Sequence, residues 1–251
     1  MINVLLSGAC GKMGKNVAAC LANDKDAKVV CGVDIADEYS SFPVFHSFDD
    51  VTVIPDVIID FSNVAVLEKL LKFATEHKIP AILAVTGYSE EQIGLIKETS
   101  KIIPIFFTAN MSLGVNLLCS LAKKAAAILA EDFDIEIIEK HHNQKLDAPS
   151  GTALMLANAV NDVLDDKYTY EYDRHSKRAK RPKNEIGIHS IRGGTIVGEH
   201  DVIFAGRDEV IALSHQATSK EVFAVGAVRA AKFMCGKEPG LYDMYDILNI
   251  V

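Results

Sequence analysis

The sequence predicts an α/β protein with two domains. The first is an N-terminal Rossmann-like domain built on a parallel sheet, and the second is an α+β domain with an open, largely antiparallel sheet. Through the first 111 residues, short apolar runs alternate with helical patterns, which is typical of right-handed βαβ crossovers. From Ile186 onward the pattern changes to strands separated by glycine-containing turns, which indicates antiparallel pairing.

The composition is that of a globular chain and excludes several classes of function. The chain has 251 residues, a net charge of −8 and 49% hydrophobic residues. The acidic balance argues against nucleic-acid binding, and no apolar run is long enough for a membrane span, so we expect neither partner. The N-terminus lacks a charged signal region, and the five scattered cysteines show no metal spacing. We therefore expect reduced thiols, no metal and a cytoplasmic location.

The first domain is expected to contain five strands joined by helices. The strands are predicted at residues 2–6, 28–33, 57–60, 81–85 and 102–107, and the helices after Gly14 and at about 65–77 and 90–99. Residues 37–50 are polar and irregular. Ligands of such sheets bind beyond the carboxyl ends of the strands. Asp60 lies at one such end, but we interpret it as a helix-capping residue and leave it out of the site.

A glycine-rich turn, G-x-x-G-x-x-G from Gly8 to Gly14, follows the first strand, and Asp34 ends the second. Glycines permit a tight turn, a helix start faces a pyrophosphate, and an acid at this place binds ribose hydroxyls. The spacing differs from G-x-G-x-x-G, so a glycine turn without a cofactor stays open as the alternative. The strand context and the acid together favour a dinucleotide.

Residues 139–153, which read EKHHNQKLDAPSGTA, gather most of the candidate chemistry. His141 and His142 end an apolar, β-branched run, and strand alternation sends them to opposite faces, which disfavours a metal pair. Lys145 follows, and a predicted helix start offers the N–H groups of Gly151 and Thr152 to an anion. The stretch can hold and protonate a small carboxylate substrate. A structural role for either histidine alone is the alternative.

This stretch resembles the signature of the dihydrodipicolinate reductase (4-hydroxy-tetrahydrodipicolinate reductase) family of diaminopimelate and lysine biosynthesis. The glycine turn, the segment from Thr108 to Asn116, the fragments H-S-I-R-G-G and G-E-H and the closing segment from Gly240 resemble it too. The resemblance implies NAD(P)H-dependent reduction of 4-hydroxy-tetrahydrodipicolinate, or dihydrodipicolinate, to tetrahydrodipicolinate. It also implies a dinucleotide-binding domain of residues 1–111 and 222–251, a substrate-binding domain of residues 112–221, and a homotetramer formed through the second domain.

The resemblance also implies residue roles. His141 and Lys145 are the expected proton donors, and His142, Gly151 and Thr152 are the expected ligands of the dicarboxylate substrate. The implied cofactor-binding residues are Gly8, Ala9, Cys10, Gly11, Lys12, Met13, Asp34, Ala84, Val85, Thr86, Thr108, Ala109, Asn110 and Met111. Met111 stands where the family often has an aromatic residue, and Ala84-Val85-Thr86 replaces a G-T-T run.

Asp34 predicts a preference for NADH, with NADPH possible, because its carboxylate would repel a ribose phosphate. The next four residues, from Ile35 to Glu38, include no cation, and Lys12 is the only obvious one nearby. Two other functions stay open: a reductase or dehydrogenase of another small imino or amino acid, and a non-catalytic nucleotide-sensing module. The basic segment 168–183 is predicted as a solvated, mobile loop, with a lid that steers an anionic substrate as the alternative.

Overall fold

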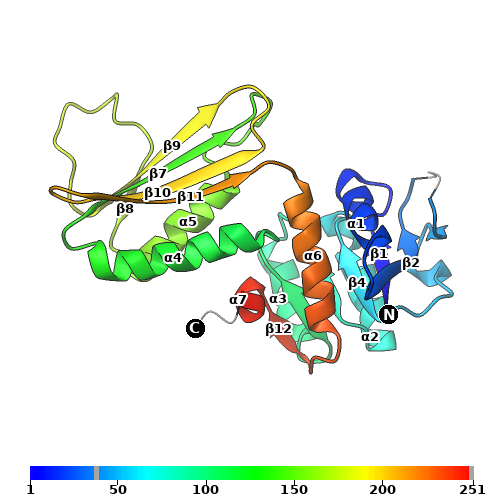
Figure 1. The fold of residues 1–251 in the computed structure, drawn as a ribbon. Coiled ribbons are helices and arrows are strands. Elements are labelled where there is room, and N and C mark those ends of the chain that lie inside the picture. Colours follow the sequence, from blue (N-terminus) through cyan, green and yellow to red (C-terminus); the bar gives the residue numbers. More distant parts are fainter. Residues whose placement is uncertain (37–39, 249–251) are drawn as a thin grey trace. The chain divides into compact units, whose positions relative to one another are not determined.

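The computed structural model describes residues 1–36 and 40–248 of the chain. Two compact units divide it: unit 1 comprises Met1–Ser112 and Glu221–Val251, and unit 2 comprises Leu113–Lys220. The predicted α/β class is confirmed, with a parallel sheet in unit 1 and a second sheet in unit 2 (Figure 1). Among the described residues, no helix combines the length and the apolar character that crossing a membrane requires.

Unit 1 is built on a seven-stranded sheet with the order β12-β6-β5-β4-β1-β2-β3 and parallel pairing throughout. Its strands are β1 (Ile2–Ser7), β2 (Ala27–Val33), β3 (Val44–Phe45), β4 (Val57–Asp60), β5 (Ala81–Leu83), β6 (Pro104–Phe107) and β12 (Gly240–Tyr242). The chain runs outward from β1 to β3 and then returns to β4 on the other side of β1. Strand order therefore reverses between β1 and β4, which is where open α/β sheets bind ligands.

The helices of unit 1 largely follow the predicted pattern. They are α1 (Lys12–Ala22), α2 (Leu67–His77), α3 (Glu90–Thr99), α6 (Glu221–Met234) and α7 (Met244–Leu248), with short 3₁₀ turns η1 (Phe48–Asp50) and η2 (Val64–Val66). The helix expected from residue 65 begins with η2, whose cap is the Asn63 side chain accepting from the Ala65 N–H at 3.0 Å. Ser89 and Gln92 form a reciprocal capping box that fixes the start of α3.

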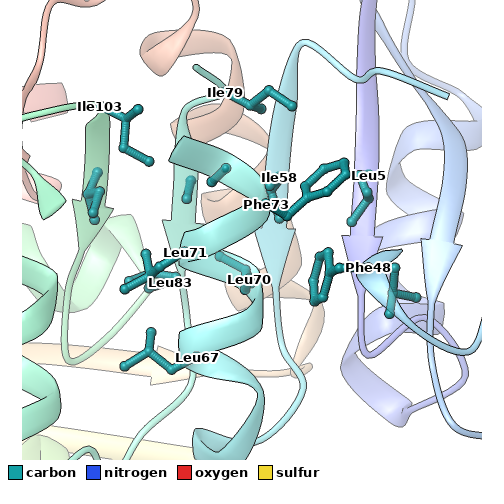
Figure 2. Close-up of a cluster of buried hydrophobic side chains, with 14 of the residues drawn as sticks. Leu5, Phe48, Ile58, Leu67, Leu70, Leu71, Phe73, Ile79, Leu83 and Ile103 are labelled. Atoms are coloured by element: carbon teal, nitrogen blue, oxygen red, sulfur yellow. The ribbon is translucent and has the colours of Figure 1, made fainter. Parts of the chain in front are cut away.

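The core of unit 1 explains why its central strands are continuous apolar runs. Leu5, Ile58 and Leu83, from three neighbouring strands, are fully buried in one cluster with side chains of α2 (Figure 2). Phe48 of η1 reaches the same cluster and lies 5.5 Å from the Phe73 ring. A parallel sheet is covered on both faces, so its strands need apolar residues at successive positions. Burying each such side chain contributes about 1.5–3 kcal/mol.

Unit 2 packs α4 (Leu113–Leu129) and α5 (Gly151–Asp162) against one face of a five-stranded sheet (Figure 1). The order is β11-β10-β7-β9-β8. The strands are β7 (Asp134–His141), β8 (Thr169–Glu171), β9 (Glu185–Arg192), β10 (Gly198–Ala205) and β11 (Val210–Ala217). Burial alternates along β7, so Ile135, Ile137, Glu139 and His141 are all buried on one face.

The antiparallel pairing expected from Ile186 onward is found between β10 and β11 but not between β9 and β10. β9 and β10 do not pair, because β7 lies between them, antiparallel to β10 and parallel to β9. Ile137 of β7 stands opposite Val202 on one side and Ile188 on the other, and all three side chains are buried. The sheet is therefore mixed. The strand at its centre, β7, ends at His141.

Candidate active site

The glycine turn after β1 brings the start of α1 close to the end of β4. Gly8 has a φ of +79°, and a Cβ there would come within 2.9 Å of the Phe61 carbonyl. A Cβ on Gly14 would lie 2.1 Å from the Gly8 carbonyl oxygen. Only glycine fits both approaches. The turn thus sits where the strand order reverses, with the amino end of a helix beside it, as a pyrophosphate site requires.

Asp34 follows β2 and is hydrogen-bonded to this turn. Its Oδ2 atom accepts from the Cys10 N–H at 2.9 Å, and its Oδ1 atom accepts from the Ala36 N–H at 3.0 Å. The carboxylate is therefore held at the edge of a cavity of about 340 Å³, which the turn and the ends of β1 and β4 also line. A cavity of this size, with a glycine cradle and a fixed acid, fits the adenosine half of a dinucleotide.

Two basic residues that line this cavity were not predicted from the sequence. His46, which precedes η1, and Lys69, in the first turn of α2, both line the cavity together with Asp34. The His46 Nδ1 atom lies 3.3 Å from the Asp34 carbonyl oxygen. Both residues are distant from Asp34 in the sequence, and no local pattern could have revealed them. The acidic positions Asp37 and Glu38, used in the cofactor prediction, lie outside the described residues.

The remaining predicted cofactor residues follow the next strands along the same edge. Ala84, Val85 and Thr86 follow β5 and line a hollow shared with the segment after β4. Thr108, Ala109 and Asn110 follow β6. Met111 is only 4% exposed, and its carbonyl oxygen lies so close to α6 that a Cβ on Gly226 would come within 1.8 Å. The structure therefore places Met111 in the packing of the unit.

A second cluster of polar groups is buried at the end of β7 in unit 2. The His141 Nδ1 atom lies 2.6 Å from Glu139 Oε2, and Glu139 is completely buried. Arg192 of β9 donates to both Glu139 oxygens, at 2.8 Å and 2.7 Å. Burial opposes ionisation of Glu139, but hydrogen bonds from Arg192, Ser190 and His141 outweigh it and hold the pKa at about 2. Glu139 is thus a carboxylate at neutral pH.

The start of α5 is bonded to the same carboxylate. The Ser150 N–H donates to Glu139 Oε1 at 3.1 Å, and the Ser150 hydroxyl caps the helix by accepting from the Ala153 N–H at 3.1 Å. Gly151 and Thr152 are the first two residues of the helix, and Gly151 is exposed. The first turn of a helix is a favourable place for a carboxylate, because the positive end of the helix dipole lies there.

Lys145 and His142 lie in the segment between β7 and α5. The Lys145 Nζ atom pairs with Asp147 Oδ1 at 2.8 Å, and the Lys145 side chain is 21% exposed. His142 is half-buried. Burial lowers the pKa of His141, the hydrogen bond and charge of Glu139 oppose this, and the charges of Lys145 and Arg192 lower it further. Lys145 therefore acts electrostatically on His141, and unit 2 holds the predicted donor and anion groups in one neighbourhood.

Three members of this cluster received no role from the sequence. Glu139 stands two positions before His141 on the same face of β7, a spacing that could have suggested the contact. Arg192 and His200 come from strands far along the chain, where no local signal connects them with His141. His200 Nε2 lies 3.1 Å from the Ser150 hydroxyl oxygen. The pKa of His200 is lowered to about 4, and burial is the main cause.

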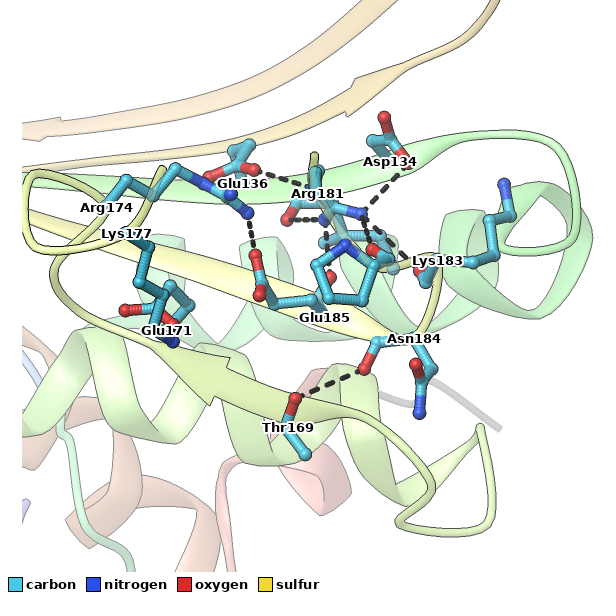
Figure 3. Close-up of polar contacts among 12 residues, drawn as sticks. Asp134, Glu136, Thr169, Glu171, Arg174, Lys177, Arg181, Lys183, Asn184 and Glu185 are labelled. Carbon is cyan, nitrogen blue, oxygen red and sulfur yellow. Dashed lines mark hydrogen bonds and ion pairs between the residues drawn. The ribbon is translucent and has the colours of Figure 1, made fainter. Parts of the chain in front are cut away.

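The basic segment before β9 contains a short strand and several ion pairs. Residues 169–171 form β8, and Arg174 and Lys177 pair with Glu185 and Glu171 (Figure 3). Arg181 is only 15% exposed, donates to Asp134 and Glu136 at 2.9 Å and 3.0 Å, and binds backbone carbonyls of β7 and β9. The expectation of a solvated side chain is therefore wrong for Arg181, whereas the Lys177 side chain is paired but 56% exposed.

Comparison with known proteins assigns the chain to a family. Family profiles described as "Dihydrodipicolinate reductase, N-terminus" and "Dihydrodipicolinate reductase, C-terminus" match residues 2–111 and 114–248. A protein named 4-hydroxy-tetrahydrodipicolinate reductase from Caldanaerobacter subterraneus subsp. tengcongensis is 54% identical over 249 residues, 99% of each chain. One of the same name from Clostridium tetani is 51% identical over 250 residues, 99% of this chain and 98% of that one.

Solved structures agree with the sequence relatives. The dipicolinate-bound dihydrodipicolinate reductase from Paenisporosarcina sp. TG-14 superposes with a TM-score of 0.83 at 25% identity and covers 100% of both chains. A diaminopimelate dehydrogenase from C. glutamicum shares the fold, with a TM-score of 0.56 at 15% identity over 97% of this chain and 92% of that one. The resemblance found in the sequence is confirmed, and the chain belongs to the dihydrodipicolinate reductase family.

Proposed function

We propose that this protein catalyses the NAD(P)H-dependent reduction of 4-hydroxy-tetrahydrodipicolinate, or dihydrodipicolinate, to tetrahydrodipicolinate in diaminopimelate and lysine biosynthesis. The observation that carries the proposal is the cluster in unit 2, where the buried Glu139 carboxylate joins His141 to the start of α5. The reaction needs a proton source beside a site for carboxylates, and this cluster supplies both. The family relationship supplies the substrate class.

Unit 1 would hold the cofactor through the glycine turn and Asp34. Its helix start faces the pyrophosphate, and Asp34 accepts hydrogen bonds from ribose hydroxyls. When bound, a reduced nicotinamide supplies the hydride. We propose a preference for NADH because Asp34 would oppose a ribose phosphate. Lys69 lines the same cavity and its positive charge reduces that opposition, so NADPH is a second, weaker cofactor.

Unit 2 would bind the substrate through its carboxylates. The N–H groups of Gly151 and Thr152 bind one carboxylate, and His142 and Lys145 bind the other carboxylate. In the unliganded protein Asp147 neutralises Lys145 at 2.8 Å. A substrate carboxylate takes the place of Asp147, so the ammonium exchanges one anionic partner for another and no buried charge is left unpaired.

Proton delivery falls to His141 and Lys145. Hydride addition to a conjugated imine leaves an enamine, whose carbon must then receive a proton. Burial disfavours the imidazolium of His141 in the unliganded protein. A bound dianion brings negative charge to the imidazole and favours its protonated form, so substrate binding itself prepares the acid. Lys145, whose Nζ atom lies 2.8 Å from Asp147 Oδ1, is the second donor.

The assembly and location form part of the same proposal. We infer a homotetramer formed through unit 2, because both described helices of this unit, α4 and α5, pack on one face of its sheet and leave the other face available. Its β11 alternates exposed and half-buried residues, and Val210 there is 64% exposed. The five cysteines are all free thiols, as in a reducing compartment, which supports a cytoplasmic location.

A coupled assay tests the function. The purified protein is mixed with freshly generated synthase product and either NADH or NADPH, and loss of the cofactor's absorbance is followed. We expect turnover with both cofactors, faster with NADH at low cofactor concentration. Turnover of other small imino acids in place of this substrate would contradict the proposal, as would binding of nucleotide with no turnover at all.

A further inference from the structure

We infer that Glu139 is a positioning residue, which fixes the His141 imidazole with its proton on Nδ1, presents Nε2 as the atom that transfers the proton, and holds the anion-binding start of α5 beside it. The inference rests on the proposed function, because the proton on Nε2 is the one that the proposed reaction transfers. The hydrogen bonds of Glu139 do not depend on that function. Glu139 lies beneath both groups and is completely buried, so it acts through them and touches no substrate.

The hydrogen bond between Glu139 and His141 determines the tautomer of the imidazole. The two atoms lie 2.6 Å apart, and an ionised carboxylate can only accept. His141 Nδ1 must therefore carry the hydrogen, and Nε2 is the nitrogen that gains and loses a proton. Space is kept at this nitrogen by Gly198 of β10, where a Cβ would lie 3.1 Å from it. The exchangeable proton is thus directed away from the buried carboxylate.

Glu139 is itself held rigidly. Arg192 binds both of its oxygens, and the same guanidinium donates to the Asp147 carbonyl at 2.6 Å. A bidentate pair of this kind fixes the plane of the carboxylate. One arginine thereby ties the buried carboxylate to the segment that carries Lys145, and Glu139 Oε1 ties it to Ser150 at 3.1 Å. The proton donor and the anion site share one support.

The charged and titratable groups around His141 come from four elements. Glu139 lies on its own strand, Lys145 on the following segment, Arg192 on β9, and His200 on β10 with its ring centroid 5.2 Å away. His215 of β11 acts on His200 from the far side. Of these groups, only Glu139 is an anion in contact with the ring. Its removal leaves the imidazole between cations, so the neutral form gains.

A matched control lies three positions earlier on the same strand. Glu136 also pairs with a histidine and an arginine, His189 Nε2 at 2.7 Å and Arg181 Nε at 3.0 Å, but on the opposite face of β7 (Figure 3 labels Glu136 and Arg181). Glu139→Gln and Glu136→Gln each remove one buried or half-buried carboxylate charge from one histidine–arginine pair. Only the first touches His141.

The test combines NMR titration of the histidines, assigned with His141→Asn, and the pH dependence of kcat/KM. In Glu139→Gln we expect the His141 midpoint to fall by about 1–2 pH units. The alkaline limb of kcat/KM should move down with it, and the rate at neutral pH should fall about 10- to 100-fold, mainly in kcat. Glu136→Gln should leave the His141 midpoint unchanged.

A measurement on the wild-type protein tests the tautomer without requiring any variant to fold. At high pH, ¹⁵N shifts of the His141 ring should identify Nδ1 as the protonated nitrogen. A ring protonated at Nε2, or a folded Glu139→Gln variant with the wild-type midpoint, would overturn the inference. Neither reading requires turnover, so they are separate from the proposed function, which fails only if the wild-type protein does not reduce its substrate.

Discussion

Replacement of Gly14 by alanine tests the construction of the cofactor site in unit 1. A Cβ at this position would lie 2.1 Å from the Gly8 carbonyl oxygen and 2.8 Å from the Ala9 carbonyl oxygen. Both atoms belong to backbone that cannot swing aside, so the start of α1 has to move by about an ångström to restore ordinary contact. Overpacking of this kind costs about 1–3 kcal/mol of stability.

The displacement should also weaken binding of the cofactor. The first turn of α1 would no longer face the pyrophosphate, and loss of about 1–2 kcal/mol there weakens NADH binding by roughly five- to thirtyfold. Alanine substitutions at two other glycines provide a milder clash and a control without a clash. Gly11→Ala would meet the Gly8 carbonyl oxygen at 3.3 Å, whereas a Cβ on Gly94, in α3, would meet no atom of the described residues within 4 Å. Gly94→Ala should stabilise α3 by up to about 1 kcal/mol.

Thermal unfolding and fluorescence titration with NADH measure the series. At about 2–4 °C per kcal/mol, Gly14→Ala should lower Tm by several degrees, Gly11→Ala by less, and Gly94→Ala not at all. The dissociation constant for NADH should rise in the same order. If Gly14→Ala unfolds and binds NADH as the wild-type protein does, the turn does not form the site described here.

Three further predictions concern the reaction. His141→Ala and Lys145→Ala should each lower kcat by about 10²–10⁴-fold, and Lys145→Ala should also raise KM; steady-state kinetics decide, and near-wild-type turnover in either removes that residue's role. Gly151→Val should keep the wild-type Tm, because a Cβ there meets no described atom within 4 Å, and should raise KM by obstructing the anion; a lower Tm with unchanged KM would contradict this. Asp34→Ala should reduce the preference for NADH, roughly tenfold or less, and Lys69→Ala should increase it; the specificity constants for both cofactors show whether the two shifts are opposite.

The sequence predicted five of the seven strands of unit 1 because their signals are local, whereas the two short edge strands β3 and β12 were not predicted. Alternation of apolar runs with amphipathic segments is sufficient for a parallel sheet, and Ser89 with Gln92 marks the start of α3 within four residues. The glycine turn and Asp34 are also local to a single βαβ unit. The short turn η2 shifted a helix start by two residues, which lies within the usual uncertainty at helix ends.

Pairing between distant strands could not be predicted in the same way. The central position of β7 depends on its two apolar neighbours, β9 and β10, which follow it by about fifty residues or more. The partners of Glu139 arise from that topology: Arg192 comes from one neighbouring strand, and His200, which contacts Ser150, from the other. The candidate residues of the fifteen-residue stretch were therefore visible in the sequence, whereas the groups that support them were not.

The most direct test of the account is a crystal structure of the protein with pyridine-2,6-dicarboxylate, a planar dicarboxylate that stands in for the substrate. We predict one carboxylate at the N–H groups of Gly151 and Thr152, and Lys145 turned from Asp147 toward the ligand. His141 should keep its hydrogen bond to Glu139, and its Nε2 atom should face the pyridine ring of the ligand. The crystals are soaked at a ligand concentration that inhibits turnover. Ligand bound at another place, with none at the start of α5, would contradict the central claim.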